Sequence, residues 1–548
     1  MIVDPILPAA RVEKMQREGW WRNKNLLDYF DATLAKNPDE VAIVDFRAES
    51  GKKLTVTYRE LDERANRVAV ALAHYGIEKQ DVVSFQLPNW WEFVVIHLAC
   101  LRIGAVSNPL MPIFRERELS FMVDYAESKI LIVPKYFRGF DHEQMMEGIR
   151  EKLPHLRHLF VVGGEGENSF EKALLKHQAS GDTATLFKER ALNPNDVVLL
   201  MYTSGTTGMP KGVMHSANTF LFSVHQMIER CALSEDDNVF MGSPLAHLTG
   251  FLAGMWLPIV LKTKTILLDT WNVGLAWRLM ADERASFAMG ATPFLSDLTN
   301  SESADECNSE RFRVFVCGGA PIPRVLAEKA VANLDIHLIA VWGMTECGVV
   351  TTTQLDDPRE KVVGTDGKAV PGSAVKVVDD QNKPLPVGVE GRLVEASPST
   401  FVGYLKNPEA YVLDADGFFD TGDLATMDED GYIRITGRSK DIIIRGGENI
   451  PIVEVENLLY THRDIVDCAV VAMPDERLGE IGCCFVTLEE GASFTFNDMK
   501  EFLIERKLAK NYFPEHLEVI PAMPRTASGK IQKFELRQIA KTLRNAAQ

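Results

Sequence analysis

The sequence predicts an α/β fold, with a large N-terminal domain of layered α/β subdomains, a small β-rich subdomain and a smaller α+β C-terminal domain. Three patterns predict it. Helical and strand patterns alternate through the first half, short strands separated by Gly, Pro and Asp begin near residue 375, and a compact mixture of both follows Gly437. A chain of 548 residues is also too long for a single hydrophobic core.

The first half carries the alternation most clearly. Residues 57–60 read Thr-Tyr-Arg-Glu, which is typical of a capping box, and apolar residues at helical spacing follow up to Gly76. Residues 82–87 and 129–133 are short apolar runs that predict strands, whereas residues 91–102 are apolar nearly all round and predict a buried helix. Strands and helices in this order favour sheets that are covered on both faces.

The second half changes pattern twice. Residues 375–380, 391–394 and 431–435 predict the strands of the β-rich subdomain. Residues 437–441, Gly-Arg-Ser-Lys-Asp, are charged and short, so we expect a linker or hinge there. The C-terminal unit then predicts helices at 453–460 and 497–507 and strands at 468–473 and 517–520.

Composition and charge exclude several classes of protein. Hydrophobic residues make up 46% and charged residues 25%, so the chain as a whole is neither disordered nor fibrous. The 59 basic and 77 acidic residues give a net charge of −18, which argues against a general affinity for nucleic acid or anionic membranes. A small basic pocket for an anionic ligand is compatible with this total.

Cysteine usage and apolar runs indicate the compartment. Eight cysteines are scattered without a Cys-x-x-Cys pair or a spaced zinc set, which indicates buried thiols in a reducing compartment. The longest apolar run, residues 251–261, is too short to span a bilayer, and the first residues lack the pattern of a signal peptide. We therefore expect a cytoplasmic protein.

The strongest local motif is Tyr-Thr-Ser-Gly-Thr-Thr-Gly-Met-Pro-Lys-Gly at residues 202–212, directly after an apolar strand at 197–202. Its glycine N–H groups, its hydroxyls and Lys211 suit phosphate oxygens. A Walker A loop would place a hydroxyl directly after the lysine, but Gly212 stands there. The motif is therefore a different phosphate loop or only a flexible turn.

Two further motifs follow apolar strands. Residues 341–346, Val-Trp-Gly-Met-Thr-Glu, offer a hydroxyl for phosphate at Thr345 and a carboxylate for magnesium at Glu346, although Thr-Glu is also a common helix start. Residues 317–323, Cys-Gly-Gly-Ala-Pro-Ile-Pro, are another motif in which a strand ends in glycines. The alternative to a functional motif here is an ordinary tight turn into a helix that starts near Pro323.

Two motifs in the second half each carry one charged candidate. Asp423, within Phe-Asp-Thr-Gly-Asp-Leu at residues 419–424, is suited to bond a ribose diol, and a plain β-turn aspartate is the alternative. Lys530 lies on a Gly-Ser-rich loop near the C-terminus and is either a mobile cation or a solvated surface lysine.

The set of motifs and their order resemble the acyl-adenylate-forming superfamily, which includes acyl-CoA synthetases, luciferases and peptide-synthetase adenylation domains. The Thr-Ser-Gly-Thr-Thr-Gly-x-Pro-Lys-Gly signature is highly specific for it, and the resemblance covers about residues 25–540. The chain looks most similar to bacterial AMP-forming ligases for short- and medium-chain fatty acids and for cyclohexanecarboxylate. The resemblance implies an ATP- and acid-binding domain, 1–437, and a mobile lid domain, 438–548, with a hinge at Lys440.

The resemblance also implies where ATP and magnesium bind. The loop at residues 203–211 would hold the β- and γ-phosphates, Trp342 would lie against adenine where the family more often has tyrosine, and Asp423 would take the ribose hydroxyls. Glu346 would hold Mg²⁺. The implied ATP- or AMP-binding residues are Thr203, Ser204, Gly205, Thr206, Thr207, Gly208, Lys211, Gly319, Ala320, Trp342, Gly343, Thr345, Asp423, Arg438 and Lys530.

The implied reaction has two halves. A carboxylate attacks the α-phosphorus of ATP to give acyl-AMP and pyrophosphate, and the thiol of CoA then displaces AMP. Lys530 and Mg²⁺ would neutralise the developing charge, so no side-chain nucleophile is needed. The implied catalytic residues are Lys530, Thr345, Glu346 and His247. After rotation of the lid, the implied CoA-binding residues are Arg445, Gly446, Gly447 and Glu448.

The acid is expected to be apolar. His247 matches the family's aromatic gate, and the implied pocket walls are Phe251, Gly254, Gly290, Ala291, Val341 and Gly343. None of these is charged, so the ammonium group of an amino acid would lie unpaired. Aliphatic, alicyclic and aromatic acids stay open, because one methylene changes binding by only about 1–3 kcal/mol.

Other functions share the same motifs. An acyl-AMP ligase that loads a separate carrier protein, an aryl-CoA (benzoate-type) ligase and a luciferase-like oxygenase stay open, whereas a non-catalytic sensor would be expected to lose Lys530 or Glu346. The expected partners are the acid, ATP and CoA. A homodimer stays open, and the resemblance implies a lysine acetyltransferase and deacetylase that act on Lys530.

Overall fold

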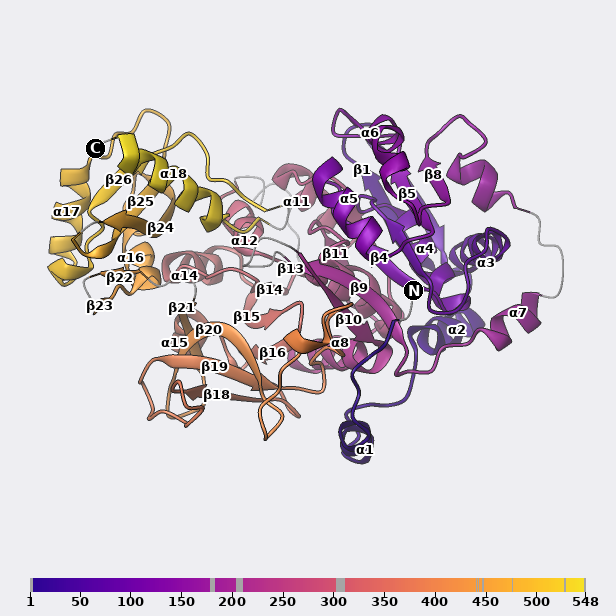
Figure 1. Ribbon diagram of the computed structural model, residues 1–548, viewed down its shortest axis with the longest axis horizontal. Coiled ribbons are helices and arrows are strands. Elements are labelled where there is room, and N and C mark those ends of the chain that lie inside the picture. Colours follow the sequence, from indigo (N-terminus) through magenta and orange to yellow (C-terminus); the bar gives the residue numbers. More distant parts are fainter. Residues whose placement is uncertain are drawn as a thin grey trace.

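The computed structural model describes residues 3–177, 183–203, 210–301, 311–439, 441, 443–445, 448–475, 477–526 and 529–546. The architecture is the predicted one: a large N-terminal domain of sheets and helices and a smaller C-terminal domain. Figure 1 shows the C-terminal domain as a yellow lobe at one end of the molecule, with the β-rich subdomain in orange beneath it.

The largest sheet in the described part of the chain has nine strands, in the order β17-β16-β15-β14-β13-β11-β12-β1-β2. Its central pairs, from β1 across to β15, are parallel. Parallel strands end at the same edge of a sheet, where ligands of α/β proteins usually bind. The strands are β1 (Val41–Arg47), β2 (Lys52–Thr57), β11 (Asn238–Met241), β12 (Thr265–Leu268), β13 (Ala285–Gly290), β14 (Val314–Gly318), β15 (His337–Met344), β16 (Gly348–Thr352) and β17 (Lys368–Ala369).

Helices α11 (Val273–Asp282), α12 (Thr292–Asn300) and α14 (Arg324–Asn333) belong to this layer. The helix expected near Pro323 is confirmed as α14, with Pro323 at its N-cap. The adjoining helices are α1 (Ala9–Arg17), α2 (Leu26–Lys36), α9 (Leu248–Gly250), α10 (Leu257–Leu261) and α15 (Arg359–Gly364), with a π-helix, η3 (Phe251–Trp256), before α10.

A second sheet has six strands in the order β10-β9-β4-β3-β5-β8. The predicted capping box is confirmed at the start of α3 (Tyr58–His74), where the Glu60 N–H donates to Thr57 Oγ1 over 3.2 Å. The predicted buried helix is α4 (Trp91–Arg102), in which every residue from Trp91 to Leu101 is buried.

The strands of this second sheet are β3 (Val82–Phe85), β4 (Val106–Pro109), β5 (Ile130–Pro134), β8 (His158–Val162), β9 (Val197–Thr203) and β10 (Lys211–Ser216). The helices of this half are α3 (Tyr58–His74), α4 (Trp91–Arg102), α5 (Glu116–Tyr125), α6 (His142–Ile149), α7 (Thr183–Glu189) and α8 (Ala217–Arg230). The smaller elements are η1 (Arg150–Lys152), η2 (Glu171–Leu175), β6 (Tyr136–Phe137) and β7 (Phe140–Asp141).

The β-rich subdomain is confirmed as an antiparallel sheet in the order β18-β19-β20-β21. Its strands are β18 (Ala374–Val378), β19 (Gly391–Ala396), β20 (Phe419–Met427) and β21 (Ile433–Arg438), and a short helix, η4 (Pro408–Ala410), lies between β19 and β20. Asp423 lies inside β20, so a plain β-turn is the wrong description of residues 419–424.

The C-terminal domain has its own sheet, in the order β23-β22-β25-β24 with β26 paired to β25. The two predicted helices and two predicted strands are confirmed, whereas β25 and α18 were not predicted. The elements are β22 (Ile444–Arg445), β23 (Glu448–Asn449), α16 (Ile452–Leu459), β24 (Ile465–Asp475), β25 (Gly479–Leu488), α17 (Phe496–Glu505), η5 (Lys510–Tyr512), β26 (His516–Val519) and α18 (Lys533–Ala546).

Two whole-chain expectations can be compared with the described residues. The seven cysteines among them are all buried and unpaired, and Cys307 lies outside them. None of the helices described is long and apolar enough to cross a membrane.

Candidate functional site

The candidate site lies at the edge of the large sheet where β14 and β15 end side by side. Gly318 pairs with Val341, so the turn at Gly319 and Ala320 lies next to Trp342. Gly319 has φ +82°, which favours glycine. A Cβ on Gly343 would lie only 1.8 Å from the carbonyl oxygen of Gly348, so this strand position requires glycine.

The predicted phosphate loop connects two paired strands. Thr203, the last residue of β9, pairs with Lys211, the first residue of β10. The Lys211 ammonium lies 4.7 Å from the ring centroid of Tyr404, a favourable cation–π distance. The predicted residues Ser204, Gly205, Thr206, Thr207 and Gly208 lie outside the described part of the chain.

Glu346 is buried in the turn between β15 and the antiparallel strand β16, so the alternative of a helix start here is wrong. The Tyr404 hydroxyl donates to Glu346 Oε1 over 2.9 Å. Burial raises the pKa of Glu346, while the bond from Tyr404 and the charges of Arg438 and Lys211 oppose the rise. An anion held in this way suits a bound cation.

A histidine that the sequence did not single out holds the backbone at Thr345. His215 Nε2 donates to the Thr345 carbonyl over 2.6 Å. Burial lowers the pKa of His215 to about 4, so the ring is neutral at physiological pH. Neither His215 nor Tyr404 belongs to a motif whose spacing would have identified it.

Asp423 faces Trp342 and Arg438. The Trp342 indole N–H donates to Asp423 Oδ2 over 2.9 Å, and Arg438 Nε donates to Oδ1 over 2.8 Å. Asp423 pairs with Arg438 across β20 and β21. The three predicted nucleotide-binding residues are therefore brought together.

Lys530 of the C-terminal domain reaches this edge of the N-terminal domain. A Cβ built on Gly319 would lie 3.3 Å from Lys530 Cε and 3.8 Å from Nζ. Burial and the charge of Arg438 lower the pKa of Lys530 to about 8, against the opposing effect of Asp423 and Glu346. A solvated surface lysine is therefore the wrong description.

The loop of Lys530 is held mainly by its own bonds. Thr526 N donates to the Lys530 carbonyl over 2.7 Å, and Lys530 N donates to Thr526 Oγ1 over 3.0 Å. Gly529 has φ +87°, and a Cβ there would lie 3.1 Å from Pro293 Cγ on α12. The loop therefore packs against the N-terminal domain at a position that only glycine suits.

His247 is the N-cap of α9, and its Nδ1 accepts from the Thr249 N–H over 3.4 Å. Burial, and then the charge of Lys530, lower the pKa of His247 to about 3. The ring is therefore neutral, and it lies close enough to Lys530 for the lysine charge to affect its pKa.

The predicted walls of the acid pocket divide into two groups. Gly290 ends β13 and Ala291 follows it, whereas Val341 and Gly343 lie in the C-terminal half of β15. Phe251 packs into an aromatic cluster, with centroid distances of 4.8 Å to His97 and 5.6 Å to Phe220. A Cβ on Gly254 would lie 2.6 Å from Met241 Cγ, so this glycine allows close packing.

Two of the predicted CoA-binding and hinge residues, Arg445 and Glu448, belong to the described strands β22 and β23. Lys440, Gly446, Gly447 and the side chain of Glu448 lie outside the described residues. Arg445 forms an ion pair with Glu515 of the same domain. In this arrangement the charge of Arg445 is thus already paired.

A magnesium ion would need oxygen ligands from the nucleotide at this site. No group of three or more His, Cys, Asp or Glu side chains that could hold a metal exists among the described residues. Mg²⁺ is commonly held by one or two carboxylates together with substrate phosphates and water. The buried carboxylate of Glu346 fits that kind of binding.

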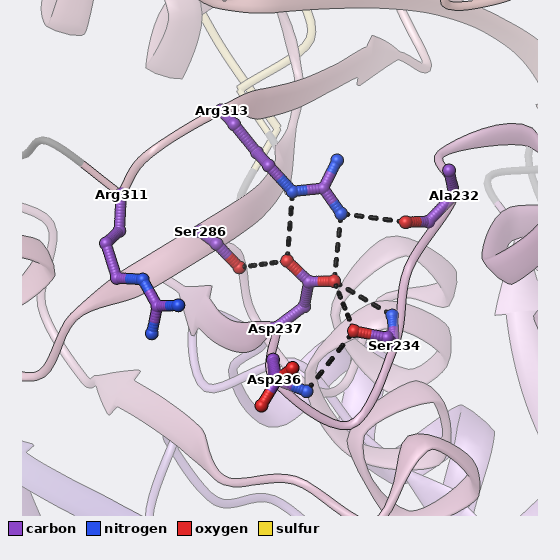
Figure 2. Close-up of a pocket in the computed structure, with 7 residues that line it drawn as sticks. All are labelled: Ala232, Ser234, Asp236, Asp237, Ser286, Arg311 and Arg313. Carbon is purple, nitrogen blue, oxygen red and sulfur yellow. Dashed lines mark hydrogen bonds and ion pairs between the residues drawn. The ribbon is translucent and has the colours of Figure 1, made fainter.

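A hollow of about 250 Å³ lies elsewhere in the large sheet layer. Figure 2 shows that Arg313 and Ser286 both point at Asp237, which also lines the hollow. Arg313 donates to Asp237 from Nε over 3.0 Å and from Nη2 over 2.8 Å, and Ser286 donates over 2.7 Å. These groups satisfy one another, so the cluster ties segments of the fold together.

Comparisons with known proteins agree with this geometry. A family model for AMP-binding enzymes matches residues 30–405, and one for the AMP-binding enzyme C-terminal domain matches residues 454–530. A medium-chain fatty-acid–CoA ligase of Escherichia coli is 39% identical over 526 residues, covering 95% of this chain and 92% of its own. A 2,3-dihydroxybenzoate-AMP ligase of Bacillus subtilis is 31% identical over 535 residues, covering 97% and 96%.

Solved structures resemble the whole chain, both domains included. ATP-bound MatB from Rhodopseudomonas palustris is 28% identical and superposes with a TM-score of 0.81, covering 95% of this chain and 100% of its own. The apo form of MatB, with the same identity and coverage, gives 0.70. The arrangement of this chain is thus more similar to the ATP-bound form. Because the first family model matches more than half of the residues, the chain belongs to the AMP-binding enzyme family, the acyl-adenylate-forming superfamily.

Proposed function

We propose that this chain joins an apolar carboxylic acid to CoA, with a short- or medium-chain fatty acid or an alicyclic, cyclohexanecarboxylate-like acid as substrate. The class of the reaction, AMP-forming acid–CoA ligation with ATP and Mg²⁺, follows from the family. The observation that carries the residue assignment is Lys530, which lies against Gly319 within the electrostatic reach of Glu346 and Asp423. The name of the 39% identical relative supports a medium-chain acid.

In the first half-reaction, a carboxylate oxygen of the acid bonds to the α-phosphorus of ATP while the bond to pyrophosphate breaks. Two anions must meet, so positive charge at the α-phosphate is decisive. We propose that Lys530 supplies this charge. Thr345, whose backbone carbonyl accepts a bond from His215, would donate a hydrogen bond to the α-phosphate. Mg²⁺ bound at Glu346 would neutralise further phosphate charge.

His247 contributes a neutral ring to this step. A pKa near 3 leaves it uncharged across the physiological range. It can therefore separate the reacting carboxylate from the apolar pocket without competing with Lys530 for the anion.

In the second half-reaction, the CoA sulfur bonds to the acyl carbonyl carbon, the bond to AMP breaks, and the thiol proton leaves to solvent. We assign CoA binding to Arg445, Gly446, Gly447 and Glu448, after rotation of domain 438–548 against domain 1–437 about Lys440. Arg445 is paired with Glu515 of the same domain, so this pair would move with the lid as it rotates. A Lys440→Pro variant should impair thioester formation more than adenylation, since proline fixes φ. Equal losses in the two isolated half-reactions would contradict the hinge.

The test of the proposed function is a pyrophosphate-release screen with ATP, CoA and acids of two to twelve carbons, cyclohexanecarboxylate and benzoate. We expect the highest kcat/KM with an aliphatic or alicyclic acid and formation of its CoA thioester. A preference for benzoate-type acids would replace this substrate with an aryl acid. Absence of pyrophosphate release with every acid would contradict the function.

A second candidate is an acyl-AMP ligase that loads a carrier protein. The observation in its favour is the 31% identity to an enzyme named as an AMP ligase. Transfer of the acyl group from supplied acyl-AMP to free CoA, compared with transfer to a carrier protein, separates the two candidates.

The proposal also includes reversible acetylation of Lys530 and a cytoplasmic location. A pKa near 8 keeps part of Lys530 as the free amine at neutral pH, which is the form that an acetyltransferase modifies. Acetylation would remove the charge that adenylation needs, and a deacetylase would restore it. The seven unpaired cysteines of the described residues support a reducing, cytoplasmic compartment. A homodimer is left to a measurement of mass in solution.

A further inference from the structure

Near Asp423, the proposed ribose-binding residue, the structure contains a hydrogen bond from Trp342 that the family resemblance did not predict. Trp342 stands where the family more often has tyrosine, and its indole N–H donates to Asp423 Oδ2 over 2.9 Å. The two side chains are nearly closed to solvent, at 8% and 5% exposure. A buried hydrogen bond to a carboxylate is stronger than one between neutral groups.

The indole is fixed by its surroundings. Its ring packs in a cluster of buried residues drawn from the turn after β15, from β16 and from all four strands of the β-rich subdomain, which are Cys347, Val350, Val377, Leu393, Ala425 and Ile433. Trp342 and Asp423 are 81 residues apart and lie in different sheets. The N–H direction is therefore set by the packing between these sheets and not by a loop.

The carboxylate of Asp423 would be free to turn without such donors, because the terminal torsion of aspartate is broad. Trp342 holds one oxygen and Arg438 holds the other, over 2.8 Å. The Arg438 side chain is 48% exposed and ends β21 two residues before the proposed hinge. Trp342 lies inside β15 of the N-terminal domain, so its bond does not depend on where the lid stands.

We propose that Trp342 is a positioning residue that orients the Asp423 carboxylate toward the ribose hydroxyls of ATP throughout the two half-reactions. This inference rests on the proposed function, which assigns the ribose to Asp423. Phenylalanine has no donor, and the hydroxyl of tyrosine lies at the tip of its ring, whereas the indole N–H lies at the ring edge. Tryptophan combines a packed ring with a donor aimed at the carboxylate.

The test compares ATP with 2′-deoxyATP and 3′-deoxyATP in acid-dependent ATP–pyrophosphate exchange. In the Trp342→Phe variant we expect the KM for ATP to rise about 5- to 10-fold, and the preference for ATP over the deoxynucleotides to shrink by a similar factor. A ring that only packs would change the rates with all three nucleotides equally. Equal changes, or an unchanged preference, would overturn the inference.

Two further variants separate the loss of the N–H group from a disturbance of packing. Trp342→benzothienylalanine keeps the ring shape and removes only the N–H, so it should reproduce the loss of preference even where phenylalanine disturbs packing. Trp277→Phe is the matched control, because Trp277 is buried in another part of the N-terminal core and its N–H has no partner among the described residues. It should leave the nucleotide preference unchanged.

The wild type separates this inference from the proposed function. Absence of exchange with every acid contradicts the ligase activity itself. Exchange without any preference for ATP over the deoxynucleotides contradicts the role of Asp423, and the inference with it. Exchange with a preference that Trp342→Phe retains contradicts the positioning role alone.

Discussion

The two sides of the site are built differently. On the N-terminal side, each polar group is held from a distant part of the chain: Glu346 by Tyr404, Thr345 by His215, and Asp423 by Trp342. On the lid side, the backbone of the Lys530 loop is held by bonds within the loop, and Arg525 ties the loop to Asp467 of the same domain. The loop meets the other domain by packing on Gly319 and Pro293. The groups proposed to bind the nucleotide are thus fixed within one domain, while the proposed catalytic cation is carried by the other domain and only packs against the first.

Among the substitutions that leave Lys530 in place, Glu346→Gln should have the largest effect, because it removes the carboxylate proposed to hold Mg²⁺. We expect adenylation to fall at least about 100-fold. Pyrophosphate release, measured as a function of Mg²⁺ concentration, checks this.

The neighbouring buried carboxylate Glu395 provides the control for that change. Burial raises the pKa of Glu395 to about 8, so it is mostly protonated at pH 7 and Glu395→Gln is nearly isosteric there. We expect little change at pH 7. An unchanged Mg²⁺ dependence in Glu346→Gln would contradict the proposal that Glu346, on the N-terminal side of the site, holds Mg²⁺.

Gly529→Ala tests whether packing of the Lys530 loop against the N-terminal domain positions Lys530. The new methyl group would meet Pro293 in addition to the strain of a positive φ, so Lys530 should lose its position. We expect adenylation to fall by on the order of 10- to 100-fold, with thioester formation from supplied acyl-AMP spared. Gly491→Ala has a similar φ of +78° in the same domain with nothing within 4 Å of its Cβ, and it should change neither half-reaction. Equal losses in both variants would mean that strain alone is responsible.

The pH profile tests the charge of Lys530. Its pKa of about 8 lies below the ordinary value, so the cation is present at lower pH and is lost as the pH rises through 8. The kcat/KM for pyrophosphate release should therefore fall about tenfold per pH unit above 8. Lys530→Arg, whose side chain stays charged, should be slower but flat between pH 7 and 9.5. Identical profiles for the two proteins would show that another group titrates.

Tyr404→Phe should have the smallest effect. It removes the hydroxyl that donates to Glu346 Oε1 and keeps the ring beneath Lys211. We expect the Mg²⁺ concentration for half-maximal rate to rise about 3- to 10-fold. Tyr58→Phe, which loses a buried bond to the Thr263 carbonyl, is the control and should leave the Mg²⁺ dependence unchanged.

The sequence predicted the fold where local patterns and packing agree. The capping box at Thr57 and the apolar helix α4 could be read directly, because end signals and burial leave one solution. Strand β25 was missed, since Gly479, Gly482 and the vicinal cysteines interrupt its pattern, and its stability comes from pairing with β24, β22 and β26. Helix α18 was missed because its polar residues obscure the buried stripe of Leu536 and Ala540.

Candidate site residues could be found in the sequence where chemical groups are concentrated in motifs. Thr345, Glu346, Asp423 and Lys530 were candidates because charged or hydroxyl groups follow glycines there, and the resemblance to the superfamily then assigned their roles. The residues that hold them, Tyr404 and His215, were not, because their roles arise from contacts 58 and 130 residues apart. The bond between Trp342 and Asp423 likewise depends on how two sheets pack, which no local pattern encodes.

The most direct test of a cation delivered by the lid uses Lys530→Ala in the two isolated half-reactions. Pyrophosphate release with acid and ATP should fall by on the order of 100- to 1000-fold. Thioester formation from supplied acyl-AMP and CoA should stay within a few-fold of the wild type. Retained pyrophosphate release, or equal losses in both half-reactions, would contradict the account.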